Sequence, residues 1–144
     1  MEVHKKTQVL DSINNDQKFS HQGKHLLLEL YRCDSYKLND ESFLRCTLNR
    51  AAKLANATVL NLISNKFEPQ GVTAIALLAE SHISIHTWPE SNYSAVDIFT
   101  CGQNMIPKLA SQYLIESLMA EEHSLRVIER NPPSGVSKHI RTIV

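Results

Sequence analysis

One stretch of the chain, residues 80–101 (ESHISIHTWPESNYSAVDIFTC), holds most of the side chains that could do chemistry. It contains Ser81 and Cys101, and two histidines, His82 and His86. A hydroxyl or thiol near an imidazole is the usual composition of a site for nucleophilic or general acid–base catalysis. The residue types alone leave blander interpretations open, since a lone cysteine is often an inert apolar side chain and a histidine is often a hydrogen-bonded surface residue.

The two histidines are spaced wrongly for a shared metal ion. His82, Ser84 and His86 alternate with isoleucines, and this period of two predicts a β-strand. Four residues along a strand separate two side chains by about 13 Å, whereas zinc–nitrogen bonds are about 2 Å long. We therefore predict no metal site.

The spacing also indicates how the reactive residues lie in the fold. Residues 81–87 and 93–101 are two predicted strands, and the proline-led turn between them predicts a β-hairpin. In this hairpin Ser81 and Cys101 lie at the same end of the sheet. His86 is five residues from Ser81, at most about 17 Å along an ideal strand. The serine and the histidine can meet only if the chain bends sharply near the serine; otherwise the histidine serves a neighbouring group.

Hydrophobic periods change along the rest of the chain. Apolar residues three or four apart predict helices, and short alternating or continuous apolar runs predict strands. The predicted helices cover 40–56 and 107–121, and the predicted strands cover 25–31, 58–63, 72–79, 81–87, 93–101 and 125–128. Because few strands are separated by helices, we expect an α+β fold: a two-layer sandwich with a mainly antiparallel sheet and two helices on one face.

Composition excludes several classes of protein. The 144 residues carry 15 basic and 15 acidic side chains, so zero net charge gives no electrostatic case for nucleic acid or an anionic membrane. No apolar run approaches the roughly 18 residues of a membrane span, and the N-terminus does not resemble a signal peptide. The three cysteines, an odd number without a CxxC motif, favour reduced thiols and a cytoplasmic location.

The two ends of the chain differ from its middle. Residues 1–22 are polar without a clear period, and we expect a flexible N-terminal extension. Residues 131–144 open with two prolines that stop regular structure, and we expect a C-terminal tail. Residues 23–130 remain as one folded catalytic domain.

The reactive stretch belongs to a longer pattern. This pattern runs through Gly71-Val72-Thr73, Glu80-Ser81-His82, His86-Thr87-Trp88-Pro89-Glu90 and Phe99-Thr100-Cys101-Gly102, and it begins at Gly23-Lys24-His25-Leu26. Over about three-quarters of its length the chain closely resembles the short prokaryotic S-adenosylmethionine decarboxylase proenzymes. The motif is long and specific, whereas a lone Glu-Ser pair would carry no information.

The resemblance implies that the chain cuts itself between Glu80 and Ser81 into a β chain of residues 1–80 and an α chain of residues 81–144. Ser81 would become an N-terminal pyruvoyl group, a covalent cofactor that forms a Schiff base with the substrate and accepts electrons as CO2 leaves. By the same resemblance, His86 is the proton acceptor in processing and Cys101 is the proton donor in decarboxylation.

Four further positions carry over from the family. Thr73 stands where relatives often have a serine that assists cleavage. Phe67 matches an aromatic residue that stacks on adenine, although plain packing would also explain it. Glu90 is expected to hold the ribose hydroxyls, with a solvated turn acid as the alternative. Glu29 is expected to face the cationic end of the substrate.

The function implied is conversion of S-adenosylmethionine to its decarboxylated form for spermidine biosynthesis, by a homodimer of cut protomers. Two alternatives stay open. A pyruvoyl-dependent arginine or ornithine decarboxylase would keep the processing motif and lose the adenosine contacts. A non-catalytic partner subunit would never cleave. No nucleic-acid or membrane partner is expected.

Overall fold

The computed structural model describes residues 22–131, which form one six-stranded sheet in the order β2-β3-β4-β5-β1-β6. Every pair of neighbouring strands is antiparallel. The strands are β1 (Gly23–Tyr31), β2 (Val59–Lys66), β3 (Val72–Leu78), β4 (Ser81–Trp88), β5 (Tyr93–Cys101) and β6 (Glu122–Arg130). The extension and tail expected at residues 1–22 and 131–144 lie outside the described residues, apart from Gln22 and Asn131.

Two helices form the second layer: α3 (Glu41–Leu54) and α4 (Pro107–Ser117). Asp40 caps α3, because its carboxylate accepts a hydrogen bond from the Phe43 amide at 2.9 Å. Pro107 begins α4, where a missing amide hydrogen costs nothing. A short helix, α2 (Ser35–Leu38), and a 3-10 turn, η1 (Pro89–Ser91), complete the elements.

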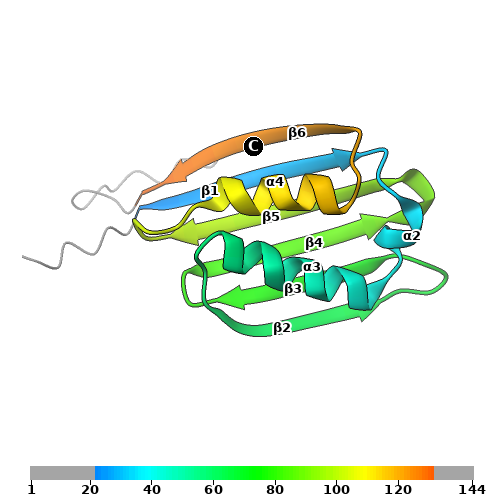
Figure 1. Ribbon diagram of the computed structural model, residues 1–144, viewed down its shortest axis with the longest axis horizontal. Coiled ribbons are helices and arrows are strands. Elements are labelled where there is room, and N and C mark those ends of the chain that lie inside the picture. The colour runs from blue at the N-terminus through cyan, green and yellow to red at the C-terminus, as the bar shows by residue number, and fades with distance from the viewer. Residues whose placement is uncertain (1–21, 132–144) are drawn as a thin grey trace, which may run out of the picture.

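Both long helices cover the same face of the sheet (Figure 1). α3 packs on β2, β3 and β4, and α4 packs on β1 and β5. Alternate residues of each central strand point into this core, as with Leu26, Leu28 and Leu30 of β1, which are at most 1% exposed. Burying each such leucine contributes about 1.5–3 kcal/mol, so this alternation decides which face the helices cover.

No element within residues 22–131 covers the other face, which we call the open face. It carries the residues that alternate with the core, and several of them are large and exposed. These are Tyr31, Ile63, Leu77, Trp88 and Ile128, each 39–58% exposed. Trp88, Tyr93 and Tyr31 stack in a row across it, with ring centroids 5.2 and 5.6 Å apart.

The expected fold class is confirmed, and so is the β4–β5 hairpin, which runs in one register from Ser81↔Thr100 to Trp88↔Tyr93. Helix α2 was not predicted, because four residues are too few to show a helical period. The second predicted helix ends earlier, at Ser117 instead of residue 121, since Met119 adopts the left-handed conformation (φ 55°). The chain then enters β6 at Glu122, so this strand is longer than the predicted 125–128.

Candidate active site

Four of the residues singled out from the sequence line one pocket on the open face, which we call the His86 pocket. It has a volume of about 340 Å³ and is lined by Phe67, Gln70, Gly71, Thr73, His86, Thr87, Trp88 and Glu90. These residues come from the β2–β3 turn, the two strands β3 and β4, and the 3-10 turn η1. The sequence analysis did not single out Gln70, and it named Trp88 only within the family motif.

His86 is held by the strand opposite. The register pairs Thr73 with His86, and the Thr73 hydroxyl lies 2.9 Å from Nδ1 of the imidazole. When Nδ1 donates this hydrogen bond, Nε2 is the nitrogen with a free lone pair, and it can accept a proton. A hydroxyl at position 73 therefore orients the ring, and because a hydroxyl can accept as well as donate, it is compatible with the tautomer that leaves Nε2 free.

The turn that carries Phe67 depends on glycine. The Phe67 amide donates to the Gly71 carbonyl at 2.8 Å, and the Gly71 amide donates to Oδ1 of Asn39 at 3.0 Å. Gly71 has φ +100°, and a Cβ at this position would lie 3.0 Å from the Thr87 carbonyl. Any other residue would therefore strain the turn whose Phe67–Gly71 hydrogen bond places the half-exposed Phe67 ring at the pocket.

A second group of reactive residues, which we call the Ser81 end, lies at the other end of β4. Ser81 pairs with Thr100, and the Cys101 amide donates to the Glu80 carbonyl at 2.9 Å. Ser81 has a backbone φ of 145°, which residues other than glycine rarely adopt. The expectation that Ser81 and Cys101 share one end of the sheet is confirmed.

The two groups do not meet within one copy of the chain. β4 pairs in unbroken register with β3 and with β5 between Ser81 and His86, so the strand does not bend there. Five residues of strand place the serine and the histidine about 17 Å apart. The chain therefore carries two separate groups of candidate residues on one sheet.

Two polar pairs lie on β1 and β5, beside β4. The Tyr93 hydroxyl donates a short hydrogen bond to Oε2 of Glu29, and the register places this pair level with His86 and Trp88. Burial, together with this neighbouring carboxylate, raises the pKa of Tyr93 to about 12, so its hydroxyl stays protonated at neutral pH. Beside this pair, His25 Nε2 lies 2.9 Å from Oδ1 of Asp97. These contacts were not predicted, because they depend on the β1–β5 register.

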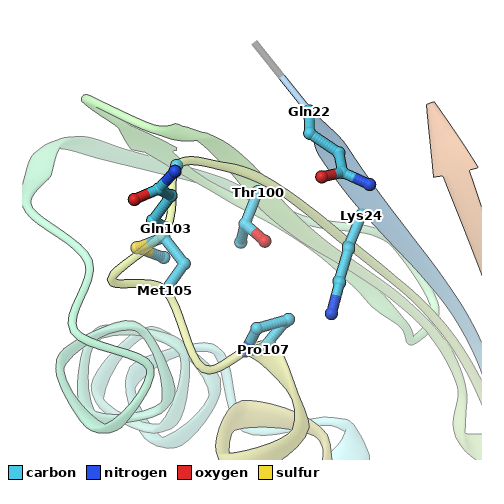
Figure 2. A pocket seen from close by; sticks show the side chains of 7 residues that line it. Gln22, Lys24, Thr100, Gln103, Met105 and Pro107 are labelled. Atoms are coloured by element: carbon cyan, nitrogen blue, oxygen red, sulfur yellow. The ribbon is translucent and has the colours of Figure 1, made fainter. Parts of the chain in front are cut away.

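Another pocket, of about 200 Å³, lies on the helix side of the sheet near the start of α4. Figure 2 shows Lys24 and Thr100 on the strands facing Met105 and Pro107 across it. It contains none of the residues of the His86 pocket, and Thr100 turns away from the open face, on which Cys101 lies. We assign it no part in the site.

The three cysteines are free thiols in different surroundings. Burial raises the pKa of the Cys33 thiol to about 11, which keeps it protonated and unreactive. Cys46 is exposed on α3. Only the half-buried Cys101 lies beside the Glu80–Ser81 bond. Across residues 22–131, no group of three or more His, Cys, Asp or Glu side chains is arranged to hold a metal ion.

The sheet carries its helices on one face and the His86 pocket on the other. The protein is therefore an α+β protein with a candidate site on the uncovered face of its sheet. Residues 24–131 match the family described as S-adenosylmethionine decarboxylase, so the chain belongs to this family. The part of the chain that the structure describes contains no helix long and apolar enough to cross a membrane.

Individual relatives agree with this assignment. The chain is 59% identical over 120 residues to the S-adenosylmethionine decarboxylase proenzyme of Synechococcus sp. (strain WH7803), covering 83% of this chain and 94% of the relative. The proenzyme of Methanococcus vannielii is 51% identical over 86 residues, covering 60% and 70%. Among solved structures, the adenosylmethionine decarboxylase from Aquifex aeolicus VF5 superposes with a TM-score of 0.73 at 36% identity, covering 83% of this chain and 99% of that one.

Proposed function

We propose that the chain is a proenzyme that cuts itself between Glu80 and Ser81 and then decarboxylates S-adenosylmethionine, supplying the aminopropyl donor for spermidine synthesis. One observation carries this proposal: Phe67, Thr73, His86 and Glu90, expected from the family to act together, line a single pocket. The family membership and the geometry at Ser81 support it further.

Self-cleavage begins at Ser81. Its hydroxyl attacks the Glu80 carbonyl, so that a bond from Oγ to the carbonyl carbon forms, the peptide C–N bond breaks, and the hydroxyl proton moves to the released amine. The Cys101 amide already donates to the carbonyl oxygen that becomes negative in this step, and such a donor stabilises the developing charge. The unfavourable φ of Ser81 is relieved when the peptide bond breaks.

Cleavage then needs a base, and His86 is our candidate. Nε2 removes the α-hydrogen of residue 81, the Cβ–Oγ bond breaks, and Glu80 leaves as a carboxylate. In this role the Thr73 hydroxyl, 2.9 Å from Nδ1, would accept from Nδ1–H and leave the lone pair on Nε2. The dehydroalanine left at position 81 tautomerises to an imine, and water hydrolyses the imine, giving its oxygen to the carbon as ammonia leaves. The resulting pyruvoyl group would supply the electron sink for decarboxylation.

The remaining residues bind the substrate and return a proton. The exposed face of Phe67 suits stacking on a purine, and an aromatic ring also attracts a sulfonium cation. Glu90, exposed at the rim of the pocket, is suited to accept hydrogen bonds from ribose hydroxyls. Cys101, beside residue 81, donates the proton to the substrate carbon after CO2 leaves.

Two copies of the chain are needed for one complete site. The base and the bond it serves lie about 17 Å apart in a single copy. Packing two open faces in opposite directions brings the His86 pocket of each copy toward the Ser81 end of the other. It would also cover the exposed Ile63, Leu77 and Trp88. Glu29 lies on the same face, where its carboxylate would attract a cationic substrate.

Intact-mass spectrometry and a CO2-release assay test the function directly. We expect the purified protein to run as two chains of 80 and 64 residues (144 − 80 = 64), with the shorter one blocked to Edman sequencing. We expect CO2 from carboxyl-labelled S-adenosylmethionine and only background from ornithine and arginine. One uncut chain after long incubation would identify a non-catalytic partner subunit. If the chain is cut but releases no CO2 from S-adenosylmethionine, the proposed substrate is wrong and the proposed self-cleavage stands.

The role of Cys101 is tested by Cys101→Ala. The alanine keeps the amide that donates to Glu80, so we expect cleavage to continue, while CO2 release per cut chain falls by about 100-fold or more because the proton donor is lost. The matched control is Cys46→Ala, at the exposed thiol on α3, which should cut and turn over normally. Unchanged turnover of Cys101→Ala would remove this thiol from the reaction.

A further inference from the structure

The side chain of Glu80 has a partner that the cleavage steps above do not use. Its carboxylate accepts hydrogen bonds from the Thr58 amide, at 3.0 Å to Oε2 and 3.3 Å to Oε1. The Thr58 carbonyl accepts from the Ala79 amide at 2.9 Å. The backbone of Thr58, just before β2, therefore holds both residues that precede the scissile bond.

Glu80 is held from the opposite side as well. The Cys101 amide, at the end of β5, donates to the Glu80 carbonyl at 2.9 Å. The acyl half of the scissile peptide is thus fixed between two strands that are not neighbours in the sheet. Ser81, on the amine half, has the strained φ of 145°. Movement during cleavage is therefore concentrated in residue 81.

Self-cleavage requires the acyl half of the scissile peptide bond to stay fixed while the amine half moves. In the first step the Glu80 acyl carbon passes from the nitrogen to Oγ of Ser81, and in the second it leaves with the oxygen. Both steps need the acyl carbon to stay in place while residue 81 turns about it. A carboxylate that accepts from an amide makes a charge-assisted hydrogen bond, which is stronger than a neutral one. Neither ion pair found among the described residues involves Glu80, so the Thr58 amide is its polar partner there.

We propose that Glu80 is a positioning residue for self-cleavage, acting through the Thr58 amide to hold the acyl group of the scissile bond in place. This role rests on the proposed self-cleavage. It concerns the side chain of Glu80, whereas the cleavage chemistry itself uses only the backbone carbonyl of this residue.

The experiment follows cutting of the full chain over time by intact mass after cell-free synthesis. We expect Glu80→Ala to slow cutting about 10- to 100-fold, because the acyl group loses one of its two anchors. We expect Glu80→Gln to cut within about threefold of wild type, since its amide oxygen still accepts from Thr58. Asp40→Ala is the matched control, because it removes a carboxylate–amide hydrogen bond of the same kind far from the scissile bond. It should lower the melting temperature and leave the cutting rate unchanged.

A double-mutant cycle separates positioning from a general loss of stability. Thr58→Pro removes the amide hydrogen and keeps the carbonyl that accepts from Ala79. On this background Glu80→Ala should slow cutting no further. Equal cutting rates for wild type and Glu80→Ala, or additive effects in the cycle, would overturn the positioning role while leaving self-cleavage intact. An uncut wild-type chain would overturn both the role and the proposed function.

Discussion

Ser81→Ala is expected to leave the chain whole and without decarboxylase activity. Alanine has no hydroxyl to attack the Glu80 carbonyl, so neither the cut nor the electron sink can form. Intact mass should show one chain of 144 residues, and CO2 release from S-adenosylmethionine should fall to background. Both losses should be complete, because no other hydroxyl follows Glu80 directly.

Ser84→Ala is the matched control for this variant. Ser84 is in the same strand, and its hydroxyl donates to Asp97 at 3.4 Å, away from the scissile bond. We expect it to cut and to turn over. A circular dichroism melt of both variants tests whether each is folded. Decarboxylation by folded, uncut Ser81→Ala would contradict the whole account, because activity would then not depend on a group made from residue 81.

The second large effect is expected when two inactive variants are combined. His86→Ala keeps Ser81 and lacks the proposed base, and Ser81→Ala keeps the proposed base and lacks the attacking hydroxyl. Neither should be cut alone. In the proposed dimer, one mixed site would combine Ser81 of the first chain with His86 of the second, because the two residues of one chain lie about 17 Å apart on the strand. We therefore expect the His86→Ala chain to be cut and the Ser81→Ala chain to stay whole.

Two different affinity tags allow the mixed dimer to be isolated, and mass spectrometry of each tagged chain reads the outcome. The control mixes two His86→Ala chains that carry the same two tags, and no cutting is expected there. If the mixed dimer also stays uncut, while wild-type chains with the same tags are cut, His86 does not act across the dimer. Cutting of His86→Ala by itself would show that another group removes the proton.

Much of the fold follows from local pattern. The alternation from Ser81 to Thr87 and from Tyr93 to Cys101 predicts two strands, because a half-buried strand must place every second side chain in the core. The proline-led turn joins them, and counting from that turn places Ser81 and Cys101 together. The family motif also implied which residues react, including His86 and Glu90, and this assignment stays a prediction.

Outside the β4–β5 hairpin, the sequence did not reveal which residues lie together across the sheet. Thr73 reaches His86 only because β3 pairs with β4 in one register, and a slip of one residue would turn its hydroxyl to the other face. Phe67 joins them through a turn that needs Gly71 in a left-handed conformation. Strand order and register depend on packing between distant segments, and a local period carries no information about that packing.

The sequence by itself determined most of the elements and the two faces of the central strands, and through the family motif it implied candidates for the reactive roles. Only the tertiary structure decided that His86 and the Glu80–Ser81 bond lie at opposite ends of a straight strand, and that the Thr58 amide donates to the Glu80 carboxylate. The physical reason is distance. A strand advances about 3.3 Å per residue without bending, so neighbours in sequence are carried apart, while hydrogen bonds between strands join residues far apart in the chain.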